Sequence, residues 1–352
     1  MKKTWINIAK AIGFLSFGSV ILYLVFRSVS KSYMEDCLAQ GNIAADCKLI
    51  DKIWLDFQEA NYWWLAAIVL VFMLSNVSRA IRWQMLFKPL GHKVKFLNSF
   101  FAIMLGYFAN LGLPRAGEFV RGSTLAAYED VAFEKSMGTI VVDRIMDFIC
   151  LAVIIVLALI FERELISGYL GGMTDGASSK GIKLGIIAAV LVGGIYIVWR
   201  LRERLSHYTL YKKLEKLFIG FVEGIGTVRK LDSPFAFIFH TIAIWVCYYL
   251  MTYLCFFAYE PTAFLGWQEG LVIFVMGAIG MIIPSPGGMG SYHAMLMAGL
   301  ALYGVTEYDG FSYANLIFFT VQIFGNILFG IMALIMLPLY NGKKKTIDEP
   351  IV

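Results

Sequence analysis

Long apolar runs recur along the whole chain, and they constrain the fold more than any other feature of the sequence. They lie near residues 8–26, 62–78, 96–112, 136–161, 182–199, 234–258, 268–283, 290–304 and 311–338. A helix needs about 20 apolar residues to cross a hydrocarbon core roughly 30 Å thick. Only 16% of the 352 residues are charged, against about 25% in a soluble domain. The sequence therefore predicts a polytopic, all-α membrane protein and excludes a soluble enzyme, a disordered scaffold and a secreted disulfide-framed module.

Three of these runs, 96–112, 268–283 and 290–304, are shorter than the others and lie beside Gly/Pro-rich sequence. Short hydrophobic segments interrupted by Gly and Pro are typical of broken or re-entrant helices. We therefore expect about six full transmembrane helices plus two oppositely oriented re-entrant hairpins, near 96–130 and 268–304. Eight fully crossing spans fit the charges equally well. Opposed hairpins favour an inverted repeat, which is a hypothesis about structure because the two halves share no convincing residue pattern.

The placement of the lysines and arginines predicts the orientation of the chain. With the N-terminus inside and the hairpin 96–130 entering from the cytoplasm, most of the 30 Lys and Arg residues fall in cytoplasmic segments. Cytoplasmic loops carry such an excess of positive residues. We expect a multi-pass protein of the bacterial cytoplasmic (inner) membrane with both termini cytoplasmic. Residues 1–340 would form a single integral membrane domain, and 341–352 a short cytoplasmic tail.

Two polar stretches outside the runs carry further predictions. Apolar residues recur at helical spacing in 50–57 and in 205–230, which predicts two short helices lying at the membrane interface. Cys37 and Cys47 share one polar segment. They can form a disulfide if that segment is extracytoplasmic.

Charged residues inside the apolar sequence at 106–121 are the strongest indication of a functional site. Asn110, Arg115, Glu118 and Arg121 surround a Pro/Gly break. A charge at membrane depth costs a few kcal/mol, so such residues face a protein interior or a water-filled cavity. Because Arg115, Glu118 and Arg121 recur every three residues, Glu118 on a helix can bridge both arginines. Either the three neutralise one another and cap the hairpin, or, as we favour, the arginines bind a phosphate-bearing substrate, with Asn110 and Glu118 beside them.

A second charged group lies early in the run 136–161. Asp143, Arg144 and Asp147 can share one helical face. They form either a self-paired trio that fixes helix packing or a charged wall of the substrate cavity. In that wall Arg144 would contact the substrate, and the two aspartates would be candidates for proton coupling. The acidic pattern of a metal-dependent lipid phosphotransferase is absent, so we expect neither a metal nor a cofactor.

The second Gly/Pro break predicts an unwound hairpin tip. Pro284, Gly287, Gly288 and Gly290 lie deep in apolar sequence. Backbone N–H groups exposed at such a tip can receive an anion. His293, just beyond, can titrate near neutral pH and is a third candidate for proton coupling, although a lone histidine is more often a structural hydrogen-bonding group.

Arg79 and Arg82, beside Trp83, follow the run 62–78. Because they lie where that helix is expected to leave the membrane, we interpret them as snorkelling anchors at the cytoplasmic boundary.

Four motifs occur in order: R-x-x-R-W at 79–83, G-x-x-x-N-x-x-L-P-R-x-G-E-x-x-R at 106–121, V-D-R-x-x-D at 142–147 and P-x-P-G-G-x-G at 284–290. Together they resemble the lysylphosphatidylglycerol synthase transmembrane region, also called the flippase-like integral membrane family. The resemblance covers nearly the whole chain. It implies an all-helical bundle with re-entrant elements.

The chain departs from this family pattern in two places. The bifunctional members carry a cytoplasmic aminoacyltransferase domain after the membrane part, whereas about a dozen polar residues follow the last run here. We therefore do not expect lysine transfer from tRNA, and we do not expect an enzyme. Relatives commonly carry an acidic residue at the position of His293, so the family's pattern does not itself assign proton coupling to that residue.

These observations favour a lipid translocator that moves the head group of a phospholipid or of a polyprenyl phosphate across the membrane. The alternatives are a membrane-embedded lipid-modifying enzyme and an accessory lipid-binding subunit of a synthase. We expect a membrane phospholipid or polyprenyl phosphate as the partner and no nucleic acid. A homo-oligomer and a separate lipid-modifying synthase are further candidates.

Overall fold

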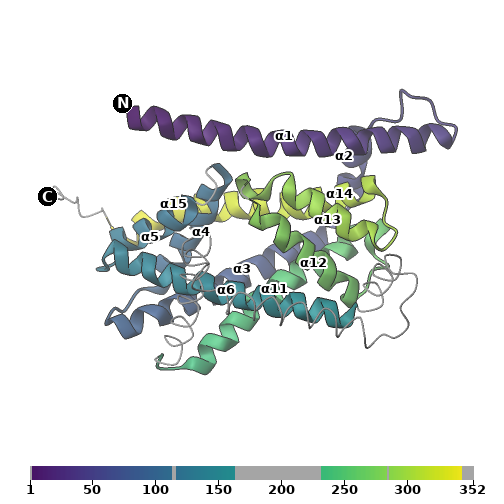
Figure 1. Cartoon of the computed structure of the whole chain (residues 1–352). Coiled ribbons are helices and arrows are strands. Elements are labelled where there is room, and N and C mark those ends of the chain that lie inside the picture. The colour runs from purple at the N-terminus through teal and green to yellow at the C-terminus, as the bar shows by residue number, and fades with distance from the viewer. Residues whose placement is uncertain (1, 113–115, 163–230, 284, 343–352) are drawn as a thin grey trace, which may run out of the picture.

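The computed structural model describes residues 2–112, 116–162, 231–283 and 285–342. Every regular element in these ranges is a helix (Figure 1). The α-helices are α1 (Lys2–Ala39), α2 (Leu49–Glu59), α3 (Tyr62–Phe87), α4 (Phe96–Gly112), α5 (Ala116–Tyr128), α6 (Phe133–Phe161), α11 (Pro234–Ala258), α12 (Trp267–Ile282), α13 (Ser291–Ala301), α14 (Glu307–Phe318) and α15 (Asn326–Asn341). Short 3-10 helices are η1 (Lys88–Leu90), η2 (Glu260–Thr262) and η3 (Pro286–Gly288), and η4 (Phe319–Gly325) is a π-helix.

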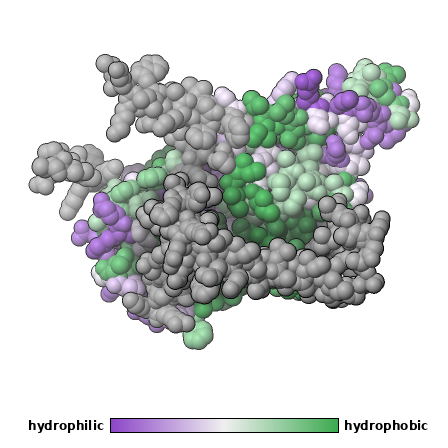
Figure 2. All heavy atoms as spheres, viewed as in Figure 1, coloured by the Kyte–Doolittle hydropathy of each residue, from purple (hydrophilic) through white to green (hydrophobic). Residues whose placement is uncertain are grey.

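Four described segments are long and apolar enough to cross a membrane. They are Tyr62–Leu90, Phe133–Phe161, Pro234–Ala258 and Glu307–Asn341, and they contain the predicted runs 62–78, 136–161, 234–258 and 311–338. On the face shown in Figure 2, hydrophilic residues gather at the two ends of the described part and a hydrophobic band lies between them. The prediction of an all-helical polytopic membrane protein is confirmed.

Two of the other predicted runs and one predicted interfacial helix lie near the N-terminus and in the middle of the chain. The run 8–26 lies within α1. The run 182–199 and the amphipathic segment 205–230 lie outside the described residues. α1 begins and α15 ends at the same end of the molecule, on the left in Figure 1, which we call the terminal end. The opposite end, where α1 gives way to α2, is the disulfide end.

Two helical hairpins have arms shorter than the membrane is thick. The first hairpin is α4–α5, and the second is α12–η3–α13. At 1.5 Å per residue the 17 residues of α4 span roughly 25 Å, and the shorter arms span less, against a hydrocarbon core of roughly 30 Å. The first hairpin opens at the terminal end, where Asn98 and Asn341 exchange two amide hydrogen bonds of 2.9 and 2.7 Å. The second hairpin opens toward the disulfide end (Figure 1).

Glycines let the arms of each hairpin pack backbone to backbone. A Cβ on Gly117 would collide with the carbonyl oxygen of Gly106, and a Cβ on Gly280 would lie 2.8 Å from the carbonyl oxygen of Ser291. One side chain then ties the arms of each hairpin together. The Gly117 N–H donates to Asn110 Oδ1 at 2.8 Å. Ser291 Oγ donates to the Gly280 carbonyl, also at 2.8 Å. Sequence-local glycines therefore determine where each chain reversal can form.

The tips of the two hairpins meet. A Cβ on Gly287, in the second tip, would lie 3.5 Å from Leu111 Cδ2 in the first. α1 covers the second tip from the side, because a Cβ on Gly18 would lie 2.8 Å from Pro286 Cδ. A Cβ on Gly290 would lie 2.7 Å from Ile21 Cγ2 of α1. Two elements that open at opposite ends of the molecule thus contact each other in its interior.

At the disulfide end, Cys37 and Cys47 form a disulfide. This is the pairing that the sequence alone left open. The predicted helix at 50–57 is α2. Lys52 of α2 pairs with Asp56 at 2.7 Å and with Asp309 of α14 at 2.9 Å. Its Nζ also lies 3.1 Å from the hydroxyl of Tyr259. This polar cluster, centred on Lys52, fastens the short helix to the bundle.

Candidate functional site

Arg79 and Arg82 are buried, so their interpretation as snorkelling anchors was wrong. Their exposed fractions are 2% and 0%. The reason is that α3 continues to Phe87, well past the apolar run that predicted its end. Both arginines therefore lie inside the bundle, opposite α6, where carboxylates meet them. A buried charge persists when it is paired and hydrogen-bonded in this way.

The partners of these two arginines are Asp143 and Asp147, one helical turn apart on α6. Arg79 Nη1 lies 3.1 Å from Asp143 Oδ2 and 3.0 Å from Asp147 Oδ2. Arg82 Nη2 lies 2.6 and 2.8 Å from the Oδ1 atoms of the same two carboxylates. The two aspartates share a face as predicted, but their main partners are the arginines of α3. Arg144 contributes a longer contact of 3.5 Å to Asp147.

Arg121 of α5 joins the same group from the first hairpin. Its Nη1 lies 3.0 Å from Asp143 Oδ2, and its guanidinium lies 3.8 Å from the centre of the Trp83 ring. Trp83 is fully buried and donates from Nε1 to Thr139 Oγ1 at 2.9 Å. The Nε and Nη2 atoms of Arg121 have no hydrogen-bond partner among the described residues. This guanidinium is therefore held firmly, yet two of its donor atoms are unpaired.

Glu118 does not bridge to Arg121. It accepts from Arg144 Nε at 2.7 Å, because α6 places Arg144 beside it while Asp143 takes Arg121. Arg115 lies outside the described residues, so its predicted contacts stay a prediction. The side chains of Glu118 and Arg144 are each 36% exposed, unlike the buried arginines. This pair is the accessible edge of the group.

We call Arg79, Arg82, Arg121 and Arg144, with Glu118, Asp143 and Asp147, the arginine cluster. Four guanidinium groups face three carboxylates, which leaves one positive charge in excess among the described residues. Tyr248 of α11 accepts from Arg79 Nη2 at 3.0 Å and lies 3.4 Å from the Tyr107 hydroxyl. Three transmembrane segments and one hairpin thus contribute side chains to a single polar interior.

A small cleft opens between the first hairpin and α6. It is lined by Ile103, Gly106, Tyr107, Asn110, Gly117, Glu118, Arg121 and Arg144. Its volume of ≈ 10 Å³ is about the least that can hold a single water molecule. Asn110, Glu118, Arg121 and Arg144, which the sequence singled out separately, therefore line one site. Asp143 and Asp147 lie directly behind it, paired with its arginines.

The second hairpin tip lies next to this site but supplies no charge to it. Gly287, Gly288 and Gly290 all have positive φ, at 57°, 81° and 81°, which favours glycine at each position. Gly287 faces Leu111, the residue after Asn110. Pro284 lies outside the described residues. The tip is thus irregular, as predicted, and the role of its backbone in binding stays a prediction.

His293 lies apart from the arginine cluster. Its exposed fraction is 1%, and its ring packs 4.7 Å from Phe318 and 5.9 Å from Phe311, measured between ring centres. No carboxylate forms an ion pair with it in the part of the chain that the structure describes. Proton coupling through His293 stays a prediction.

Sequence reasoning missed the roles of Arg79, Arg82 and Tyr248. The signal for the arginines was present, because two arginines three residues apart on one helix match two aspartates four residues apart on another. Tyr248 could not be found in this way, since tyrosine is common in membrane helices and its partner is 169 residues away.

The fold and the buried polar interior define a polytopic, all-helical membrane protein. A family model described as the lysylphosphatidylglycerol synthase TM region matches residues 48–338. The chain belongs to this family of membrane proteins, which is linked to lipid metabolism or transport. No curated protein and no solved structure matches the chain. α1, which covers the second hairpin tip, lies before the matched residues.

Proposed function

We propose that the protein is a lipid translocator that carries a phosphate-bearing head group, of a phospholipid or of a polyprenyl phosphate, past the arginine cluster. One observation carries the proposal: Arg121 is buried, borders the cleft and has two unpaired donor atoms. Buried polar groups are nearly always hydrogen-bonded. An arginine with free donors beside an accessible second arginine is therefore suited to an oxyanion that arrives from outside the protein.

The exchange of partners on Arg144 provides the binding step. In the described conformation Arg144 forms an ion pair with Glu118 at the exposed edge of the cleft. A phosphate can replace this carboxylate, because an arginine makes charge-assisted, bidentate hydrogen bonds to either group. Arg121 and Asn110 would then complete the contacts. Asp143 keeps the remaining guanidinium groups paired throughout, so the inner part of the arginine cluster need not move.

The two hairpin tips provide the gates. The two hairpins open at opposite ends of the molecule, and their tips meet at Leu111 and Gly287. In transporters with opposed broken helices, substrate sites lie near the bilayer midplane between the two elements. The cleft of ≈ 10 Å³ is too small for a phosphate head group, so a tip must move before the substrate can enter. Movement of either tip away from the other would enlarge it toward one side of the membrane.

We further infer the orientation in an inner membrane. Disulfides persist in oxidising compartments outside the cytoplasm. The Cys37–Cys47 disulfide therefore supports an extracytoplasmic position for the disulfide end. The terminal end would then face the cytoplasm, in agreement with the distribution of lysines and arginines.

Purified protein in liposomes tests the proposal. A labelled phospholipid should change leaflets faster than in protein-free liposomes, and Arg144→Gln should reduce this rate about tenfold or more. The matched control is Lys88→Gln, whose ion pair with Asp232 at 3.9 Å is exposed and should not affect the rate. Equal rates for wild type and Arg144→Gln would exclude this site. Lipid mass spectrometry of the same samples should show no new product; a modified lipid would instead indicate an enzyme.

A further inference from the structure

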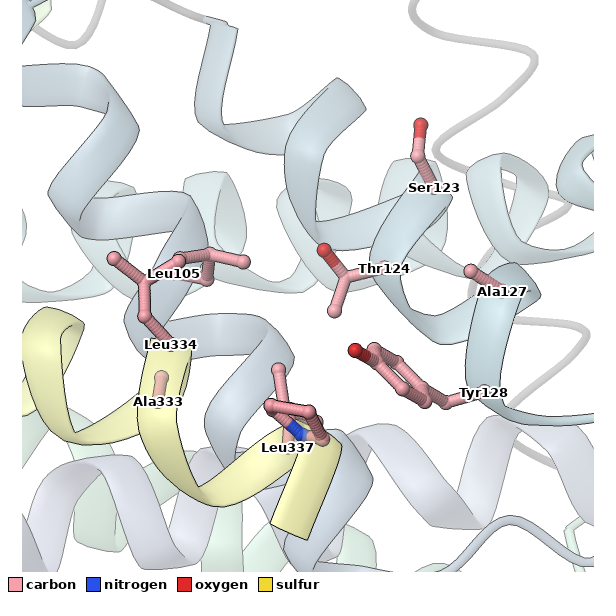
Figure 3. Close-up of a pocket in the computed structure, with 9 residues that line it drawn as sticks. Leu105, Ser123, Thr124, Ala127, Tyr128, Ala333, Leu334 and Leu337 are labelled. Atoms are coloured by element: carbon pink, nitrogen blue, oxygen red, sulfur yellow. The ribbon is translucent and has the colours of Figure 1, made fainter. Parts of the chain in front are cut away.

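A second cavity lies on the other flank of the first hairpin, between α5 and α15 (Figure 3). Its volume is ≈ 240 Å³, far larger than the cleft at the arginine cluster. Leu105, Thr124, Ala127, Tyr128, Leu334 and Leu337 are among the residues that line it. No charged side chain lines it among the described residues. The family match and the proposed function assign nothing to this cavity.

Contacts between α15 and α4 on both sides of the cavity keep it open. Toward the interior, α15 packs directly on α4, where a Cβ on Gly330 would lie 2.5 Å from Phe108 Cβ. At the terminal end, Asn341 and Asn98 exchange their amide hydrogen bonds. α15 is therefore fastened to α4 on both sides of the cavity. The facing side of α5 carries Ala127, which is too small to fill the space.

The cavity borders the lipid phase. α15 is the last part of the membrane-spanning segment Glu307–Asn341. Leu334, on the rim, is 52% exposed while Leu337 is buried, so the cavity leads from the outer surface of the bundle inward. An apolar opening on this surface faces hydrocarbon chains, because the surrounding solvent is the bilayer.

The polar atoms of the lining are confined to one side. The hydroxyls of Thr124 and Tyr128 point toward the space enclosed by the leucines (Figure 3). An apolar chain that carries oxygen atoms near one end matches this arrangement better than a purely apolar molecule does.

We propose that this cavity holds an acyl chain of a resident membrane glycerophospholipid, with the ester region of the lipid beside Thr124 and Tyr128. The bound chain fills the space that α5 leaves and supports the hairpin that carries Arg121. The inference goes beyond the proposed function and does not depend on it, because a lipid can occupy this cavity whether or not the protein moves lipids.

Photo-cross-linking tests this inference in the full-length protein. The probe is a phosphatidylglycerol with a diazirine in one acyl chain, in vesicles of phosphatidylethanolamine and phosphatidylglycerol. We expect cross-links to residues 123–128 and 333–338, which are lost in Ala127→Phe because the added ring fills the cavity. The matched control is Ala152→Phe on the exposed face of α6, which should leave these cross-links unchanged.

Two further variants keep the test decisive. Thr124→Phe enlarges a side chain that points into the cavity (Figure 3) and replaces Ala127→Phe if that variant does not fold. Arg144→Gln should retain the cross-links, so failure of the head-group site is distinguished from failure of the chain site. Labelling at the cavity no stronger than at the exposed face of α6, or unaffected by both filling variants, would overturn the proposal and indicate ordinary contact with bulk lipid.

Discussion

The guanidinium carbon of Arg121 lies over the indole of Trp83, 3.8 Å from the ring centre. This contact joins the first hairpin to α3 and orients the arginine that borders the cleft. An arginine over a desolvated indole gains about 2 kcal/mol or more. This cation–π contact, together with the ion pair to Asp143, explains how a guanidinium with unpaired donors keeps its position inside the protein.

Replacement of Trp83 should therefore weaken both the fold and the site. Trp83→Phe removes the hydrogen bond to Thr139 and provides a smaller ring for Arg121. We expect a loss of about 1–2 kcal/mol in the free energy of unfolding, measured by chemical denaturation in detergent. Trp54→Phe is the control, since Trp54 is 67% exposed and should change stability by less than about 0.5 kcal/mol. Equal effects of the two substitutions would contradict the role of the stacked pair.

Asp143 should be the most sensitive member of the arginine cluster. It pairs with Arg79, Arg82 and Arg121, so Asp143→Asn leaves buried guanidinium groups without a counter-charge. Removal of one partner from a buried pair costs about 3–5 kcal/mol, which thermal and chemical unfolding would detect. Asp232→Asn removes the carboxylate of an exposed pair and should be nearly neutral. A stability of Asp143→Asn close to that of wild type would contradict the role of Asp143 as the shared counter-charge.

The first hairpin should not tolerate a side chain at Gly117. A Cβ there meets the carbonyl oxygen of Gly106 and the Asn110 side chain, so Gly117→Ala must separate the arms. We expect a loss of about 1–3 kcal/mol and slower lipid movement. Gly138→Ala on α6 is the matched control, because a Cβ at that position meets no atom within 4 Å. The prediction fails if both alanine variants unfold at the same denaturant concentration.

The cluster around Lys52 predicts a pH dependence at the disulfide end. Burial lowers the pKa of Lys52, but hydrogen bonds with Asp56 and Asp309 outweigh it, so the pKa lies above the ordinary value. A raised pKa in the folded state stabilises the fold fully below the unfolded-state value of about 10.4, and this contribution is lost as the pH rises through the folded-state pKa. The stability difference between wild type and Lys52→Met should be constant near neutral pH and shrink in strong alkali. A difference that stays constant into strong alkali would refute this assignment.

The sequence predicted those features that depend on neighbouring residues. Spans follow from local hydropathy, and the chain reversals follow from the glycines and prolines around Asn110 and Gly287. The ion-pair partners of the buried side chains were harder to predict, because they come from distant segments of the chain. Arg79 was assigned to the interface because the apolar run stops near 78, whereas its aspartate partners lie more than 60 residues further along the chain. The contact of Gly18 with Pro286 likewise has no signal in the sequence around either residue.

Lipid movement before and after the two hairpin tips are cross-linked tests the central claim most directly. Leu111→Cys and Gly287→Cys, in a chain with Cys150 and Cys247 replaced by serine, would be joined by a short bismaleimide. Each variant with only one of the two introduced cysteines, treated in the same way, is the control. If the tips are gates, the joined protein should move a labelled phospholipid no faster than protein-free liposomes, while both controls remain active. Unchanged movement in the joined protein would contradict a path between the tips.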